Sequence, residues 1–288
     1  MSQPRNHHTV PKAYLKYFTD LNGKINVYDK QTQQYFKSYI KNIAANRDFY
    51  RDILIENEFY WESFYAKTVE PLIPLTFDML IMSSLIITNT NKILNSELRV
   101  KLSYIIFTQL MRSKKSWDTW LKTAANLGDN DLPLNIKSKI DDLLKLGKSE
   151  AEAFDLINKS YLLQILNSKD LILSNIETLL NMNWIVLKNN NTSKGFYTSD
   201  NPVTFFHIDS KSCNFIEYGP LYKGCIIMFP INYDLCLMLI PLEHVDTQNL
   251  TQYNNCILDT STDLIDACNQ IQNEQCYRQV YYKPQLVD

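Results

Sequence analysis

Hydrophobic residues recur at helical spacing through the middle of the chain, over roughly residues 58–182. Apolar positions three and four apart predict helices from Asn95 or Ser96 to about Leu121, from Leu134 to a stop at Gly147, and from Ser168 to Leu179. Ser149 and Glu152 have the spacing of a capping box, so another helix is expected to begin there. The apolar stretch from Pro71 to Thr88, interrupted by Asp78, is expected to be a buried helix.

Alternating or continuous apolar runs flank this helical middle on both sides. Residues 25–28 and 35–40 predict a hairpin, and later strands are expected at 184–187, 196–198, 203–206, 225–229, 235–240 and 279–282. Two further helices are expected, one at Val10–Phe18 and a last one at Gln248–Asn273. The prediction is an α+β fold in which the helical middle packs with a mainly antiparallel sheet. One domain is expected over 1–288, with the strand-rich part at 183–288 plus 1–50.

The composition and the motifs of the chain argue against several classes of function. The net charge is −2 at pI 6.1, without the basic excess that phosphate neutralisation usually requires of a nucleic-acid binder. The chain has no GxxxxGK[ST] loop, GxGxxG, HExxH or EF-hand loop. No CxxC occurs, and the six cysteines are expected to be reduced structural thiols. The polar start and the lack of a long uninterrupted apolar window predict a cytoplasmic protein without a membrane segment.

Three polar side chains of catalytic type lie in apolar surroundings in distant parts of the chain. His8 titrates near neutrality, which suits general acid–base work, or it fills a polar niche. Arg112 shares a helix face with Gln109 three residues earlier. Its guanidinium either binds a phosphate or carboxylate, or pairs internally with Glu62, Glu70 or Asp200. Asp200 follows a predicted strand. Its carboxylate either belongs to a functional site or bonds the backbone of a turn.

Weaker candidates surround these three. Ser199, Asn201 and Tyr14 are predicted to contact substrate. Glu58, Glu62 and Glu70 lie near one face of a helix, where three acids suit Mg²⁺ or Ca²⁺, although such a stripe is more often solvated, and no metal site is predicted. His7 is expected to be an exposed neighbour of His8.

The opening segment from His8 to Phe18 resembles the start of the family called domain of unknown function 4238, in which His-x-Val-Pro precedes a Tyr-Leu and a Phe. The resemblance continues through Val27-Tyr28-Asp29, Asp48-Phe49-Tyr50, Gln109-x-x-Arg112 and Ser199-Asp200-Asn201-Pro202. Ser113-Lys114 replaces the Thr-Pro expected after the arginine. The resemblance implies a family and no biochemical role, and its spread across microbes suits an accessory or defence function.

The sequence therefore favours a hydrolase acting on phosphodiesters, with RNA as the expected partner and an RNase-type effector role in defence or toxicity. In this hypothesis His8 is the general acid or base, Arg112 stabilises phosphoryl charge, Gln109 orients it, and Asp200 orients His8 or binds a metal. The alternative is a non-enzymatic ligand- or protein-binding module in which the same residues form a structural network. Cofactor and oligomeric state are left open.

Overall fold

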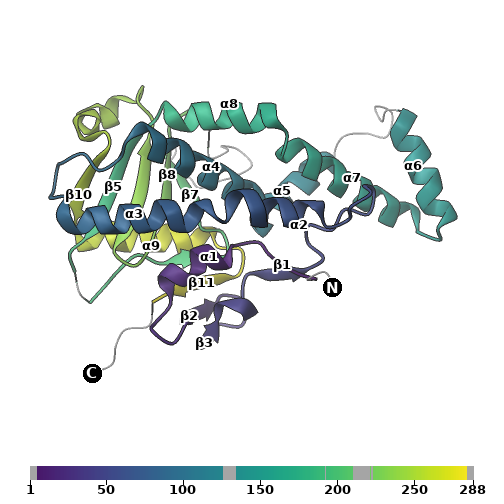
Figure 1. Cartoon of the computed structure of the whole chain (residues 1–288), viewed down its shortest axis with the longest axis horizontal. Coiled ribbons are helices and arrows are strands. Elements are labelled where there is room, and N and C mark those ends of the chain that lie inside the picture. Colours follow the sequence, from purple (N-terminus) through teal and green to yellow (C-terminus); the bar gives the residue numbers. More distant parts are fainter. Residues whose placement is uncertain (1–4, 126–133, 192, 210–220, 222, 284–288) are drawn as a thin grey trace.

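A computed structural model describes residues 5–125, 134–191, 193–209, 221 and 223–283. A layer of helices covers one side of a central sheet, and a smaller sheet lies below it (Figure 1). The α+β prediction is confirmed.

The middle of the chain is a succession of helices. They are α2 (Tyr60–Phe64), the π-helical segment η3 (Tyr65–Val69), α3 (Leu72–Ile86), α4 (Ser96–Arg112), α5 (Lys114–Ala125), α6 (Leu134–Lys145), α7 (Glu150–Leu166) and α8 (Lys169–Leu180). Local signals in the sequence set several of their ends. Ser149 and Glu152 form the predicted capping box of α7, and Ser168 caps α8 by accepting from the N–H of Leu171.

The central sheet has the strand order β10-β5-β9-β8-β7. Its strands are β5 (Asn183–Asn189), β7 (Thr204–His207), β8 (Cys225–Pro230), β9 (Leu235–Ile240) and β10 (Cys256–Thr260). All neighbours are antiparallel except β10 and β5. Most positions on β5, β8 and β9 are buried, which explains why these strands appear in the sequence as continuous apolar runs rather than alternating ones.

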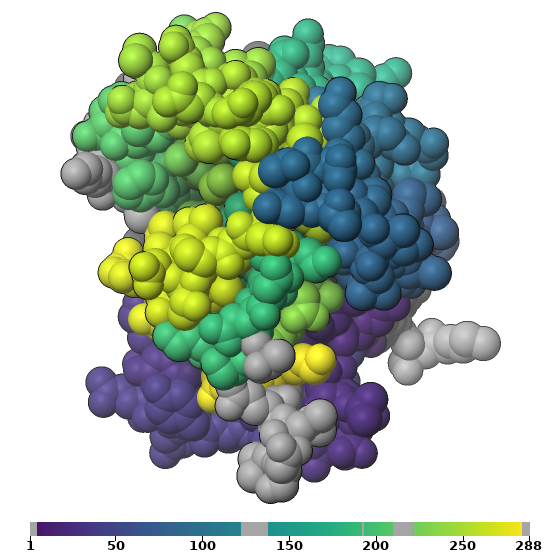
Figure 2. All heavy atoms as spheres, turned by 90° about the vertical axis from the view of Figure 1, so that its left-hand side faces the viewer, coloured from purple at the N-terminus to yellow at the C-terminus, as the bar shows by residue number. Residues whose placement is uncertain are grey.

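A second sheet joins residues from opposite ends of the sequence. Its order is β3-β2-β11-β6, and its strands are β2 (Lys24–Asp29), β3 (Gln34–Tyr39), β6 (Thr198–Ser199) and β11 (Gln279–Tyr282). Figure 2 shows the late, yellow residues beside the early, purple ones. A third sheet pairs β1 (Asn6–His8) with β4 (Ala45–Arg47). The predicted first helix is present as α1 (Lys12–Leu15) followed by the 3-10 turn η1 (Lys16–Phe18).

The predicted helix at Gln248–Asn273 is wrong. The 3-10 segment η5 (Val245–Tyr253) is followed by β10, and α9 (Thr262–Gln275) begins only after it. Asn255 has a φ of 70°, a left-handed conformation that ends a helical path and that asparagine tolerates. The apolar residues just after it pair with β5 instead of continuing a helix.

The predicted helix running to about Leu121 breaks at Ser113. Ser113 is extended, with φ −66° and ψ 141°. Its hydroxyl oxygen accepts from the backbone N–H of Ser116 at 3.2 Å, which is how a serine caps the start of a new helix. The break places Arg112 at the very end of α4, where its side chain turns into the protein.

The helix α3 is apolar on both sides, so the expectation of a buried helix holds for one face only. Ile73, Phe77 and Leu80 are buried, whereas Leu75 and Met82 are exposed. The stretch Tyr60–Ile86 is the one described helix long and apolar enough to cross a membrane by length and composition alone, with a mean hydropathy of 1.5 and 33% of its window buried in the protein.

The five cysteines among the described residues are buried: Cys225, Cys236, Cys256, Cys268 and Cys276. Cys213 lies outside the described residues. The thiols therefore pack as small hydrophobes in the core.

Candidate functional site

Arg112, at the end of α4, lies in the interior with 1% of its surface exposed. Its Nη2 donates to the backbone oxygen of His8 at 2.8 Å and to Oε1 of Glu70 at 3.2 Å. Its Nε donates to the hydroxyl of Tyr50 at 3.2 Å. The internal ion pair with Glu70 is one of the alternatives expected from the sequence, and it compensates much of the cost of burying the charge.

Two tyrosine rings enclose the same guanidinium. Its Cζ lies 4.4 Å from the ring centroid of Tyr65 and 5.5 Å from that of Tyr50, within the range of cation–π attraction. Burial raises the pKa of Tyr65 to about 12 and raises that of Tyr50 as well. Both rings are therefore neutral at pH 7, and their electron-rich faces stabilise the cation.

The charge of Arg112 persists despite its burial. Burial lowers its pKa, but the neighbouring Tyr50 and Glu70 raise it more strongly, so the net shift is upward. A guanidinium held charged in a water-poor interior is a strong electrostatic element, because opposing charges are poorly screened there.

Gln109 and Arg112 together hold the N-terminal segment. One turn before Arg112, the Nε2 of Gln109 donates to the backbone oxygen of Thr9 at 3.0 Å. The two side chains therefore bind the carbonyl groups of consecutive residues, His8 and Thr9. Because positions three apart on a helix point the same way, the Gln-x-x-Arg spacing fixes this double contact.

The segment η3 brings two acids to the arginine. A π turn contains more residues than an α turn, so the positions after it rotate back relative to those before it. Glu70, at the end of η3, contacts Arg112. Burial raises the pKa of Glu62, on the α2 side of the segment, and the nearby charge of Arg112 opposes that rise. Glu62 and Glu70 therefore share one side of the helix. We call Arg112 with His8, Tyr50, Glu62, Tyr65 and Glu70 the arginine centre.

Three buried polar atoms of the arginine centre have no hydrogen-bond partner: Nε2 of His8, Oε2 of Glu62 and Nη1 of Arg112. Burial lowers the pKa of His8, and the positive charge of Lys12 lowers it further. Burial raises the pKa of Glu62. His8 is thus shifted toward the neutral base and Glu62 toward the neutral acid, the separation that acid–base pairs require.

The centre approaches the surface on one side. The side chain of Glu70 is 25% exposed, and Lys12, whose charge acts on both His8 and Glu62, is exposed.

Asp200 does not join this centre. Its carboxylate accepts from the backbone N–H groups of Tyr277, Arg278 and Gln279 at 2.7 to 2.9 Å, at the start of β11. Burial raises its pKa to about 6, although these three bonds lower it. The structure therefore brings His8, Gln109 and Arg112 together and gives Asp200 partners of its own.

The residues predicted to contact substrate are also bonded internally. The hydroxyl of Ser199 donates to Oε1 of Gln272 at 2.8 Å, and Nδ2 of Asn201 donates to the backbone oxygen of Gln275 at 3.1 Å. Tyr14 bonds Thr198 at 2.7 Å and the backbone oxygen of Pro230 at 2.8 Å. We call Asp200, Ser199 and Asn201 with Gln272 and Gln275 the Asp200 network.

His7 is not the exposed neighbour that was expected. It is fully buried, and its Nδ1 accepts from the backbone N–H of Tyr50 at 2.9 Å. Glu58 pairs with Arg51 at 2.6 Å, away from the other two acids of its stripe. Among the described residues, no three His, Cys, Asp or Glu side chains gather to hold a metal ion.

Sequence reasoning missed Tyr50, Tyr65 and Lys12 as members or neighbours of the site. Tyr50 lies in the Asp48-Phe49-Tyr50 segment and Lys12 in the His8–Phe18 segment, and both segments carry part of the family resemblance, which was the available signal. Nothing in the local sequence of Tyr65 separates it from the other aromatic residues of its helix.

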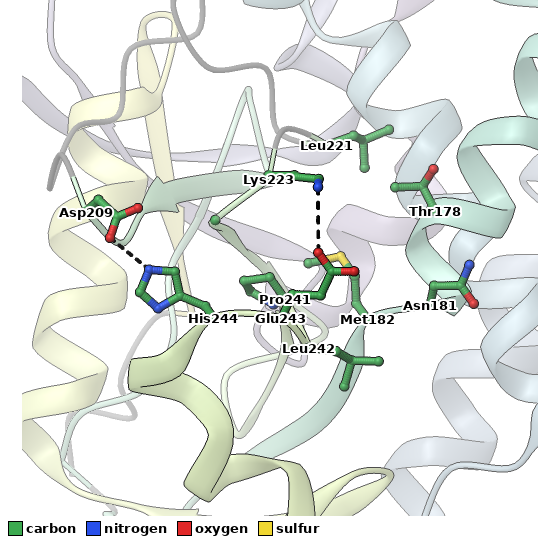
Figure 3. A pocket seen from close by; sticks show the side chains of 11 residues that line it. Thr178, Asn181, Met182, Asp209, Leu221, Lys223, Pro241, Leu242, Glu243 and His244 are labelled. Carbon is green, nitrogen blue, oxygen red and sulfur yellow. Dashed lines mark hydrogen bonds and ion pairs between the residues drawn. The ribbon is translucent and has the colours of Figure 1, made fainter.

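A pocket of about 600 Å³ lies elsewhere, between the end of α8 and the ends of β8 and β9 (Figure 3). Its charged residues are paired: Nε2 of His244 lies 2.8 Å from Asp209, and Lys223 lies 3.7 Å from Glu243. Gln109, Asp200 and the other residues predicted from sequence do not line it.

The model of a family described as "Protein of unknown function (DUF4238)" matches residues 6–285, nearly the whole chain. This match confirms the resemblance found in the sequence. No curated protein and no solved structure matches the chain.

Proposed function

The chain belongs to the family of proteins of unknown function DUF4238, and we propose that it is a hydrolase of phosphodiester bonds with its reaction centre at the arginine centre. The supporting observation is the set of three buried, unpartnered polar atoms on His8, Glu62 and Arg112. Leaving such atoms unpaired costs about 1–3 kcal/mol each. A fold that keeps a base, an acid and a cation in this condition is poised to pair them with a substrate.

RNA is the expected substrate, because its 2′-hydroxyl is an internal nucleophile. The reaction then needs a base, an acid and a cation, and the three side chains supply these. Neutral His8 takes the 2′-hydroxyl proton on Nε2 while the oxygen attacks phosphorus. Protonated Glu62 gives its proton to the departing 5′-oxygen. Nη1 of Arg112 donates to a non-bridging oxygen, which gains charge as the bonds change. Water then opens the cyclic phosphate, with His8 and Glu62 exchanging roles.

The alternative is a non-enzymatic ligand- or protein-binding module in which the same residues hold the fold together. The observation that favours it is the near-complete burial of Arg112 together with its bond to the backbone oxygen of His8. A guanidinium that bonds two distant segments of the chain also stabilises the fold, whether or not it binds a ligand.

Glu62→Gln separates the two proposals. Incubation of the purified chain with a fluorescently labelled single-stranded RNA measures cleavage, and DNA of the same sequence, which lacks the 2′-hydroxyl, should stay intact. We expect Glu62→Gln to lower kcat/KM about 10²–10⁴-fold because the acid is lost. Its free energy of unfolding should change by less than about 0.5 kcal/mol, because Oε2 has no partner to lose.

Glu58→Gln is the matched control, an acid four residues earlier, in the turn before α2, that pairs with Arg51; it should retain full activity. A wild-type chain that leaves the RNA intact, or a Glu62→Gln chain as active as the wild type, would contradict the hydrolase proposal. Expression in cells extends the test to a role in defence or toxicity: wild type should degrade RNA and arrest growth, and Glu62→Gln should not.

A further inference from the structure

The outer face of α3 carries a row of exposed apolar side chains. Figure 1 shows this helix lying across the face of the molecule nearest the viewer. Between 51% and 83% of each residue in the row is exposed: Leu75, Met79, Met82, Leu85 and Ile86. Monomeric proteins rarely leave so many large apolar residues together in water. The row therefore needs a partner surface.

The spacing of the row fits another helix. Leu75, Met79, Met82 and Ile86 follow one another at steps of four, three and four residues, which is the repeat of a coiled-coil seam. Leu85 lies at its edge. We call these five residues the α3 seam. A narrow seam of this kind accepts the ridges of one facing helix.

The charges of α3 disfavour a lipid surface as that partner. The helix contains no lysine and no arginine, and its one charged residue, Asp78, is exposed beside the seam. Helices that lie on membranes usually carry Lys and Arg for the anionic headgroups. The opposite side of α3 is used in the protein core, where Phe77 and Leu80 are fully buried.

The apolar area agrees with pairing between two copies of the same helix. The exposed surface of the seam is on the order of 600 Å², so two facing copies would bury about 1,200 Å², above the roughly 1,000 Å² expected of a specific interface. Antiparallel pairing sets Leu75 against Ile86 and Met79 against Met82 around a twofold axis. The seam is thus complementary to itself, and the flexible methionines can adjust at its centre.

We propose that two copies of this chain form a dimer through the α3 seam, packed antiparallel about a twofold axis between Met79 and Met82. Sedimentation velocity of the full chain over a range of concentrations tests this directly. We expect a species of twice 33.7 kDa. Met82→Lys places two cations near the axis and should weaken the dimer at least about 100-fold.

Leu173→Lys is the matched control, because Leu173 is an apolar residue of α8 with 52% exposure outside the seam; it should dimerise as the wild type does. Circular dichroism checks that each variant is folded, and Met79→Gln serves as a milder second variant. The proposal is overturned by a wild type that stays monomeric throughout, by a dimer that folded seam variants leave unchanged, or by a monomer that binds neutral or anionic vesicles.

Discussion

The arginine centre and the Asp200 network are both built from buried polar residues that stand out in the sequence, yet they differ in how completely they are bonded. Both oxygens of Asp200 accept backbone N–H groups, and Ser199 and Asn201 are bonded to α9 and its end. The arginine centre leaves Nε2 of His8, Oε2 of Glu62 and Nη1 of Arg112 unpartnered.

This difference separates a role in folding from a capacity for binding. A saturated network has no donor or acceptor left for a ligand, so it contributes to stability alone. An unsaturated one lowers stability and keeps its bonding capacity for something else, as functional sites commonly do. Residue type does not distinguish the two cases, because both regions contain carboxylates in apolar surroundings.

Arg112→Met tests how much of the fold depends on the arginine centre, and we expect the largest effect here. The change removes the cation and leaves Glu70 and the His8 carbonyl without their partner, which should lower the free energy of unfolding by about 3–5 kcal/mol. Urea unfolding followed by tryptophan fluorescence measures it. Arg51→Met, at a half-buried ion pair with Glu58 near the surface, is the control, with an expected loss of about 1 kcal/mol or less. If both variants lose the same free energy of unfolding, the arginine centre contributes no more to stability than the Arg51–Glu58 pair does.

Asp200→Ala tests whether the saturated network is structural. Three N–H groups lose their acceptor at the start of β11, and the expected loss of unfolding free energy is about 3 kcal/mol. Asp266→Ala, which breaks an exposed pair with Lys194, should cost less than about 1 kcal/mol. The Asp200→Ala protein that remains folded should cleave phosphodiesters at the wild-type rate. If the folded Asp200→Ala protein no longer cleaves RNA, Asp200 takes part in the reaction.

The pH dependence of stability tests the environment of His8 and should give the smallest effect. Its pKa in the folded protein is below the value of about 6.5 in an unfolded chain. Burial lowers it most, and Lys12 and Arg112 act in the same direction, whereas a hydrogen bond with the backbone of Ile40 and the charge of Glu70 oppose them. The folded state therefore binds this proton less readily than the unfolded state. Its contribution to stability is present above about pH 6.5 and is lost as the pH falls through the folded pKa.

His8→Gln removes this component and keeps the backbone oxygen that Arg112 binds. The difference in unfolding free energy between wild type and His8→Gln should shrink as the pH is lowered from 7 toward 5. Parallel pH profiles for the two proteins would show that the imidazole does not titrate with a lowered pKa. Other groups that titrate in this range are present in both proteins and cancel in the comparison.

The parts of the fold that depend on neighbouring residues could be predicted from the sequence. The capping box at Ser149, the Ser168 cap and the hairpin at residues 24–39 are set by residues within a few positions of each other. The strand β10 could not be predicted in this way, because its apolar residues become a strand by pairing with β5, about seventy residues earlier. Periodicity alone does not separate a short apolar strand from a segment of buried helix.

The candidate site could also be predicted only in part. The helical spacing of Gln109 and Arg112 correctly indicated two side chains on one face, and an internal pair with Glu70 was among the expected alternatives. The approach of Tyr65 and Glu62 depends on the π-helical segment, which no simple sequence pattern marks. Which polar atoms remain unpartnered is decided by the whole packed interior and is visible only in three dimensions.

The strand β11 ties residues 279–282 to residues 26–29, and Gln279 donates to Asp29 across a separation of 250 positions. During synthesis at about 5–20 residues per second, β2 must wait roughly 10–50 s for this neighbour to leave the ribosome. Through that interval the early hairpin has an open edge able to pair with other nascent chains. Production of the protein in cells should therefore respond strongly to translation speed and to chaperones that shield such edges.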